Sequence, residues 1–241
     1  MTMNEDLGAT GPETAEEIGT TEPGATNELV ALKDALLEEM LPDVVFDGWS
    51  AKALREAAVR LSISREELAA ILPGGAGDIA LWLDDWADRK MVAALERMGL
   101  DQMKVHHRII AGVRVRLEIL APYREAVRRA IAREISPFGF GHAARAIYRT
   151  VDAIWYAAGD NSADFNFYTK RGLLAAVYSA TVLYWLDDNS EGHEDTWAFL
   201  ERRIADVLKL PRLTGQMGQR LRRAARSVTG PLTYLKRKAT R

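Results

Sequence analysis

The 241-residue chain contains no cysteine, which excludes disulfide bridges, thiolate metal sites and cysteine nucleophiles. Its four histidines leave little material for an imidazole metal centre. No apolar run approaches the roughly 20 residues that a membrane-spanning helix needs, so we expect a soluble or peripheral protein. With 48% hydrophobic residues, a chain of this length can fill a core, and we expect a globular protein.

The known enzyme signatures are also missing. The sequence contains no Gly-rich phosphate loop, no nucleophile elbow, no Glu-x-x-His pair of a di-iron site and no Cys/His zinc spacing. The adjacent His106 and His107 would point about 100° apart on a helix and would not converge on one ion. Asp187 and Asp188 precede a predicted helix start, where carboxylates ordinarily act as caps. We therefore expect no enzyme, no catalytic residue and no metal site.

Each end of the chain lacks charges of one sign: basic residues are missing at the amino-terminal end and acidic residues at the carboxy-terminal end. The net charge is −2, yet residues 1–100 carry 8 Lys/Arg against 20 Asp/Glu, whereas residues 209–241 carry 10 Lys/Arg and no acid. Residues 1–27 are rich in Glu, Gly and Thr, lack Lys and Arg, and predict a disordered acidic tail. This composition fits neither a secretory signal nor a mitochondrial transit peptide.

Residues 28–75 predict three short helices of a helix-turn-helix unit. The first covers about residues 27–41, and Pro42 helps to end it. Ser50 is the predicted N-cap of the second helix. Ser64 caps the third helix, with Glu67 at the capping-box spacing.

The third of these helices would be the one that reads DNA. It offers Arg65 beside Glu66 and Glu67, within a strongly acidic segment. Because neutralisation of phosphates supplies most of the affinity for DNA, we do not expect nucleic acid as a partner. A degenerate helix-turn-helix that serves packing is the simpler interpretation.

Residues 76–210 predict a helical bundle for ligand binding and dimerisation. Trp82, Trp86 and Met91 belong to a stripe that is either plain core or the wall of an apolar cavity. The last long apolar segment is apolar nearly all round, so it must be buried on more than one side, and we expect a homodimer. Helical apolar spacing recurs over residues 79–98, 103–120, 122–135, 143–158 and 167–186.

Several charged residues of the bundle have a predicted environment. Asp152, on an otherwise nearly uncharged helix face, can act as a cap, pair with an arginine such as Arg145 or Arg149, or face water. The basic residues of the helix over 103–120 are expected to face largely outward. They are Lys104, Arg108, Arg114 and Arg116.

The stretch 159–171, GDNSADFNFYTKR, joins two apolar helices and has an unusual composition. Its polar half, which includes Asp164, can cap the start of the second helix. Its aromatic residues Phe165, Phe167 and Tyr168 are core plugs, a partner-facing hot spot, or both.

Residues 211–241 form a basic segment with an amphipathic pattern. Such a helix lies flat on an anionic membrane surface, which is the expected role. Attraction to nucleic acid and docking on the acidic amino-terminal segment are the alternatives. The apolar candidates for membrane contact are Leu213, Met217, Leu221 and Val228, and the basic ones are Arg222, Arg223 and Arg226.

Three motifs carry a resemblance to a known family. They are GDNSADFNFYTKR at 159–171, AAVYSATVLYWLDDNS at 175–190 and EDTWAFLERRI at 194–204. Together they resemble the coenzyme Q biosynthesis accessory proteins, and the resemblance extends from about Val30 to Leu210. It implies an all-α, TetR-like bundle that binds an isoprenoid lipid and assists the di-iron demethoxyubiquinone hydroxylase.

The resemblance also implies site residues. The aromatic pair at positions 167 and 168 would contribute to hydroxylase binding, together with Asp164 and Arg171. A bound isoprenoid quinone would replace any conventional cofactor. The candidates for its cavity are Trp82, Trp86, Met91, Val151, Trp155, Leu174, Val177, Tyr178 and Thr181.

We therefore expect a non-enzymatic protein that binds an isoprenoid quinone intermediate and presents it to the hydroxylase. The lack of a transit peptide points to a bacterial protein that works from the cytoplasm at the inner membrane. The alternative is a TetR-type transcription regulator that senses an apolar ligand, because the same bundle and cavity serve both functions.

Overall fold

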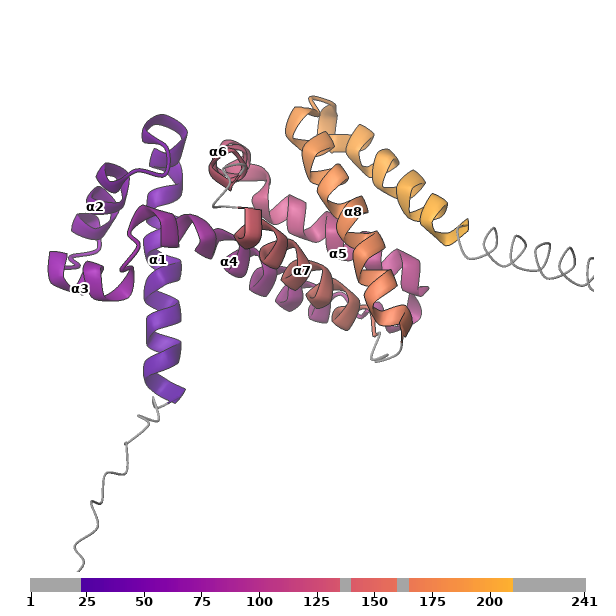
Figure 1. Ribbon diagram of the computed structural model, residues 1–241, viewed down its shortest axis with the longest axis horizontal. Helices are drawn as coiled ribbons and strands as arrows, with labels where there is room; N and C mark the ends of the chain where they lie inside the picture. Colours follow the sequence, from indigo (N-terminus) through magenta and orange to yellow (C-terminus); the bar gives the residue numbers. More distant parts are fainter. Residues whose placement is uncertain (1–22, 135–139, 160–164, 210–241) are drawn as a thin grey trace, which may run out of the picture.

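The structure, a computed structural model, describes residues 23–134, 140–159 and 165–209, and it contains helices but no strands within these ranges (Figure 1). The predicted all-α class is confirmed. None of the described helices is long and apolar enough to cross a bilayer. The helices are α1 (Pro23–Asp47), α2 (Ala51–Arg60), α3 (Arg65–Ile71), α4 (Ala76–Arg97), α5 (Val105–Leu120), α6 (Arg124–Glu134), α7 (Phe140–Ala157), α8 (Phe165–Asp187) and a further helix over 194–209.

The predicted helix starts of the amino-terminal unit are confirmed. The Ser50 hydroxyl accepts a hydrogen bond from the Ala53 amide at 3.2 Å and caps α2. At α3, the Ser64 hydroxyl accepts from the Glu67 amide at 3.2 Å, and the Glu67 carboxylate accepts from the Ser64 amide at 2.9 Å. This reciprocal capping box satisfies two amide groups that have no partner within the helix.

The helix α1 is longer than the sequence predicts. It begins at Pro23, inside the predicted acidic tail, and it continues through Pro42 to Asp47. The expectation that Pro42 helps to end the helix is wrong. Leu41 and Val44, on either side of the proline, are fully buried, so the extra turn is stabilised by apolar burial. The proline side chain is exposed and removes only one backbone hydrogen bond.

Polar contacts join α1 to α4. Trp82 Nε1 donates to Asp34 at 2.8 Å, and Trp86 Nε1 donates to Glu38 at 3.0 Å. Trp82 and Trp86 are four residues apart on α4, and Asp34 and Glu38 are four residues apart on α1. Both pairs can therefore form at the same time. Lys90 donates to Glu38 at 2.7 Å, and this hydrogen bond lowers the pKa of that carboxyl. The helix α4 thereby connects the α1–α3 unit to the bundle (Figure 1).

The bundle consists of α4 to α8 and the helix over 194–209. The helix α4 packs against α5 and α7, and α7 packs against α8. Gly112 lets α5 approach α7 closely, since a Cβ atom there would lie 3.0 Å from Ile154 Cγ2. Each large apolar side chain buried in this core contributes about 1.5–3 kcal/mol.

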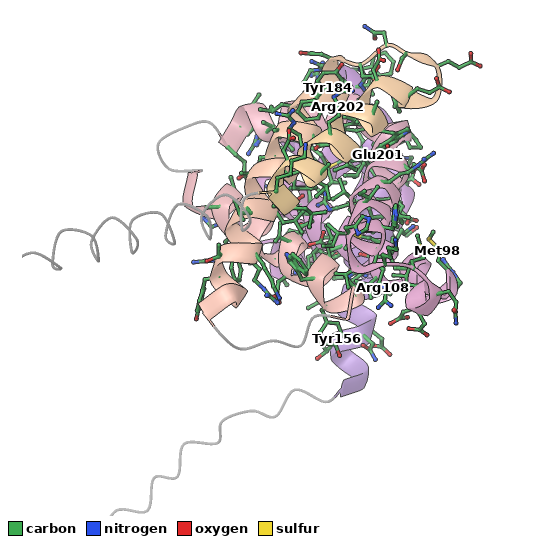
Figure 2. All side chains as sticks on the ribbon, turned by 90° about the vertical axis from the view of Figure 1, so that its right-hand side faces the viewer. Met98, Arg108, Tyr156, Tyr184, Glu201 and Arg202 are labelled. Carbon is green, nitrogen blue, oxygen red and sulfur yellow. The ribbon has the colours of Figure 1, made fainter. Side chains whose placement is uncertain are left out.

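One end of the bundle is closed by Arg108, which Figure 2 labels beside Tyr156. Its guanidinium donates to the carbonyl oxygens of Met103, Asp101 and Ala158 at 2.9, 3.0 and 3.1 Å. Arg108 is therefore half-buried rather than outward-facing as predicted, because these carbonyls at the ends of helices need donors. The expected outward positions of Lys104 and Arg114 are confirmed.

The opposite end of the bundle is fixed at the carboxyl end of α8. Arg124 donates to the Leu186 carbonyl at 2.7 Å, a favourable position for a cation beside a helix carboxyl terminus. Asp188 accepts hydrogen bonds from the backbone and side chains of Ser190 and Thr196. Burial opposes ionisation of this carboxyl, but these bonds outweigh it and lower its pKa. The predicted capping role is confirmed for Asp188, whereas the exposed carboxylate of Asp187 accepts from Arg128 at 3.3 Å.

The segments predicted to be tails fall largely beyond the described part of the chain. Residues 1–22 and 210–241 are outside it, so the proposed disorder of the acidic tail and the amphipathic membrane segment stay predictions. The membrane candidates outside it are Leu213, Met217, Leu221, Arg222, Arg223, Arg226 and Val228.

Candidate functional site

A cavity of about 800 Å³ lies between α4, α5, α6, α7 and α8. It reaches the surface beside Leu183, which is 58% exposed. The volume falls in the range of small-molecule sites, and such sites are mostly apolar. The apolar side chains that line it are Ala80, Leu81, Leu83, Leu117, Leu120, Val127, Ala130, Ile131, Ala143, Ala146, Ile147, Val182 and Leu183.

One wall of the cavity is a network of polar side chains centred on Arg116, which is only 2% exposed. Its Nε donates to Asp88 Oδ1 and its Nη2 donates to Asp84 Oδ1, both at 2.7 Å. Its Nη1 donates to the Tyr178 hydroxyl oxygen. A guanidinium removed from water is tolerated only when such partners compensate for its charge.

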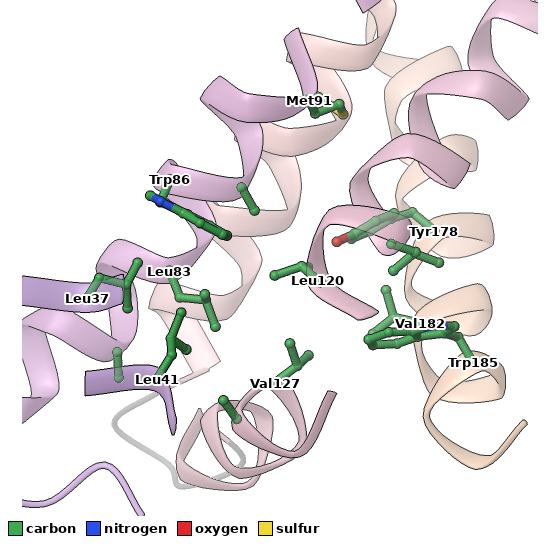
Figure 3. Close-up of a cluster of buried hydrophobic side chains, with 14 of the residues drawn as sticks. Leu37, Leu41, Leu83, Trp86, Met91, Leu120, Val127, Tyr178, Val182 and Trp185 are labelled. Carbon is green, nitrogen blue, oxygen red and sulfur yellow. The ribbon is translucent and has the colours of Figure 1, made fainter. Parts of the chain in front are cut away.

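The network extends to α7. Thr150 Oγ1 lies 2.9 and 3.0 Å from the two carboxylate oxygens of Asp88, and Arg149 Nε donates to Asp88 at 3.3 Å. Side chains of α4, α5, α7 and α8 therefore meet at one buried ion pair. Figure 3 shows Tyr178 projecting from α8 into this region, near Leu120 of α5.

The burial of Arg116 contradicts the prediction that it faces outward. The periodic signal was present, because Arg116 follows the buried Val113 by three residues and precedes the buried Leu120 by four. Asp88 likewise lies between the buried Ala87 and Met91, and its burial was not predicted from the sequence. A charged residue on the buried face of a helix is stable when a residue of opposite charge on another helix contacts it. The sequence alone does not show which residues of different helices pair in this way.

Of the nine predicted lipid-binding residues, Tyr178 lines the cavity. Trp82 and Trp86 face α1, as described above, and Trp155 is half-buried with the Lys170 ammonium over its ring. Thr181 is buried and donates to a backbone carbonyl of its own helix. The four remaining candidates are buried in the core: Met91, Val151, Leu174 and Val177.

The predicted partner-binding residues occupy different environments. Tyr168 is 71% exposed near the start of α8, close to the end of α7 where Tyr156 is 73% exposed. Arg171 is 4% exposed, and its Nε donates to Asp152 at 2.6 Å. The predicted alternative that Asp152 pairs with an arginine is confirmed, and the partner is Arg171 rather than Arg145 or Arg149. Position 167 lies within α8, and Asp164 is outside the described residues.

The buried network gives a prediction about stability. Replacing Arg116 with Met removes the positive charge that compensates the buried carboxylate of Asp88. We therefore expect the free energy of unfolding, measured with urea, to fall by about 3–5 kcal/mol. Arg114→Met is the matched control, because Arg114 is exposed on the same helix and pairs with Glu118, and it should cost less than about 1 kcal/mol. Equal losses for the two variants would contradict a central role of Arg116.

Comparison with known proteins gives the chain its relatives. Residues 140–211 match the COQ9 family. The chain is 31% identical over 186 residues to human "Ubiquinone biosynthesis protein COQ9, mitochondrial", a match that covers 74% of the chain and 58% of the human protein. The corresponding protein of Dictyostelium discoideum is 27% identical, with 74% of the chain and 60% of that protein covered. The chain thus spans about three-fifths of the length of these relatives.

A solved structure supports the fold. The TetR transcriptional regulator from Nitrosomonas europaea superposes with a TM-score of 0.61, covering 72% of this chain and 96% of the regulator. At 23% sequence identity, this likeness shows the fold and not the function. The predicted TetR-like fold is confirmed.

The comparisons also correct one expectation. The chain was predicted to be a bacterial protein of the cytoplasm, whereas its relatives from human, cattle, fly and Dictyostelium discoideum are named mitochondrial proteins of eukaryotes. The composition of an amino-terminal segment was too weak a basis for that prediction. The resemblance that the three motifs indicate is nevertheless confirmed: the chain has a TetR-like fold and is similar to the COQ9 ubiquinone biosynthesis proteins, with the family match in residues 140–211.

Proposed function

We propose that the chain is a non-enzymatic lipid-binding accessory protein of ubiquinone biosynthesis. It holds an isoprenoid quinone intermediate and presents it to the demethoxyubiquinone hydroxylase. The observation that carries this proposal is the cavity of about 800 Å³ with a largely apolar wall, in a chain similar to COQ9 proteins.

The energetics of lipid transfer favour such a cavity. An isoprenoid quinone is stable in a bilayer because each buried methylene group is worth about 0.8 kcal/mol. A soluble active site therefore receives the molecule at lower cost when a protein cavity replaces the hydrocarbon environment. The exposed rim beside Leu183 leaves a route by which a long tail extends beyond the cavity. The basic segment 211–241 would hold the protein at the membrane surface.

Two exposed surfaces suit macromolecular partners. The aromatic side chains of Tyr156 and Tyr168 lie at the α7–α8 junction, where we place hydroxylase docking. We assign contact with a second copy of the chain to two exposed side chains, Tyr184 on α8 and Leu208 on the helix over 194–209.

The cavity is tested by filling it. Ala146 lines the cavity from α7, so Ala146→Trp should reduce the lipid that co-purifies with the protein severalfold, as measured by mass spectrometry. Ala144→Trp is the matched control, because Ala144 is exposed on the same helix, and it should retain the wild-type amount. A wild-type protein that carries no lipid, or only hydrophilic molecules, would overturn the proposal.

The docking surface is tested separately. Tyr168→Ala should weaken binding to the purified hydroxylase by about 30-fold or more, the effect of losing a hot-spot contact of about 2 kcal/mol, without a change in thermal stability. Tyr148→Ala, at another exposed tyrosine on α7, should leave binding unchanged. If Tyr168→Ala unfolds the protein instead, the residue serves the core and the partner surface lies elsewhere.

A further inference from the structure

The Tyr178 hydroxyl has a hydrogen that no described residue accepts. Its oxygen accepts a hydrogen bond from Arg116, which has donors only, so the tyrosine cannot donate in return. Among residues 23–134, 140–159 and 165–209, no other hydrogen bond to this hydroxyl is formed. The side chain is 5% exposed, and an unused donor in such a place costs about 1–3 kcal/mol.

The position of this hydroxyl points to a ligand. Tyr178 lines the cavity, and in Figure 3 its hydroxyl points away from α8 toward Leu120, another lining residue. Ser179, the next residue, also lines the cavity, and within the described chain its hydroxyl makes no hydrogen bond. A molecule in the cavity therefore meets hydroxyl donors on α8, next to the polar wall around Arg116 and the apolar side chains of the rest of the lining.

The charges around Tyr178 indicate which kind of hydrogen-bond acceptor a ligand can place there. The positive charge of Arg116 is compensated by Asp84 and Asp88, and the side chain of Asp84 is 38% exposed on the cavity wall. Glu134 adds a second carboxylate to the lining, and burial raises its pKa, with Asp84 as a further cause. Two basic residues, Arg133 and His142, also line the cavity, and Arg133 Nη1 donates to the Trp49 carbonyl. At the Tyr178 hydroxyl itself, the charge of Arg116 is already compensated, and the carboxylate of Asp84 on the same guanidinium opposes an anionic head group.

The donor itself keeps its proton. Burial raises the pKa of Tyr178 above its ordinary value, so the side chain is a neutral phenol at physiological pH. The hydrogen bond from Arg116 to its oxygen polarises the O–H group and strengthens it as a donor.

We propose that Tyr178 donates a hydrogen bond to an uncharged oxygen acceptor of the lipid head group, such as a quinone carbonyl. The hydroxyl thereby favours neutral, carbonyl-bearing lipids over hydrocarbons of equal size, and the nearby Asp84 opposes an anion at this point of the wall. This inference rests on the proposed function for the presence of a lipid, but the selectivity arises from Tyr178 and the charges around it.

The test uses three probes that carry the same short isoprenoid tail: a ubiquinone, a methylated benzene without oxygens, and a phosphate monoester. The delipidated full chain should bind the quinone more tightly than the hydrocarbon, and tighter binding of the phosphate than of the quinone would overturn the assignment of a neutral acceptor. Tyr178→Phe should weaken quinone binding by about tenfold, equivalent to about 1.4 kcal/mol, and leave binding of the hydrocarbon within about twofold. Tyr148→Phe, which removes a hydroxyl outside the cavity, should leave binding of all three unchanged.

A second readout uses the wild-type protein, since Tyr178→Phe also removes an acceptor from buried Arg116 and can destabilise the fold. The infrared carbonyl stretch of the bound quinone should shift to lower frequency than in a hydrocarbon solvent, as expected for a hydrogen-bonded carbonyl. The absence of this shift, or equal losses for the quinone and the hydrocarbon in a folded Tyr178→Phe, would overturn the inference alone. Failure of the wild-type protein to bind any of the probes would overturn the proposed function as well.

Discussion

The buried ion pair between Arg116 and the carboxylates of Asp84 and Asp88 is the interaction on which the bundle depends. A guanidinium at this depth is stable only if its donors are met in nearly fixed geometry. Its partners come from different helices, so satisfying Arg116 fixes α4, α5 and α8 relative to one another. Thr150 and Arg149 add α7 through Asp88. The cavity is the space that these helices enclose.

This arrangement links stability to ligand binding. A cavity lined only by leucine, valine and alanine would accept any apolar molecule of the right volume. The charges of the network are largely compensated within the protein, and the Tyr178 hydroxyl adds a neutral donor to the polar part of the lining. The same contacts that stabilise the bundle thus give the cavity a neutral donor, and the helices that position this donor also carry the exposed tyrosines at the α7–α8 junction.

Local signals in the sequence were sufficient to predict the helices and several of their ends, but not the ends of α1, which continues through Pro42. Ser50, Ser64 and Asp188 act as caps because their hydrogen bonds join residues close in the chain. The motifs on the last helices show the similarity to the COQ9 proteins and predicted the TetR-like fold. The cavity was less predictable. Trp82 and Trp86 are residue types that often line a ligand cavity. In the structure they point toward α1 instead, because they donate hydrogen bonds to its carboxylates. Arg116 pairs with residues about 30 positions earlier, a contact that periodicity alone does not encode.

The most direct measurement is a crystal structure of the full chain with a bound short-tailed ubiquinone. We expect electron density for the quinone between α4 and α8, with one carbonyl oxygen within hydrogen-bond distance of the Tyr178 hydroxyl and the tail directed toward the rim beside Leu183. Density at another site, or a cavity filled by the protein's own side chains with no ligand present, would contradict it.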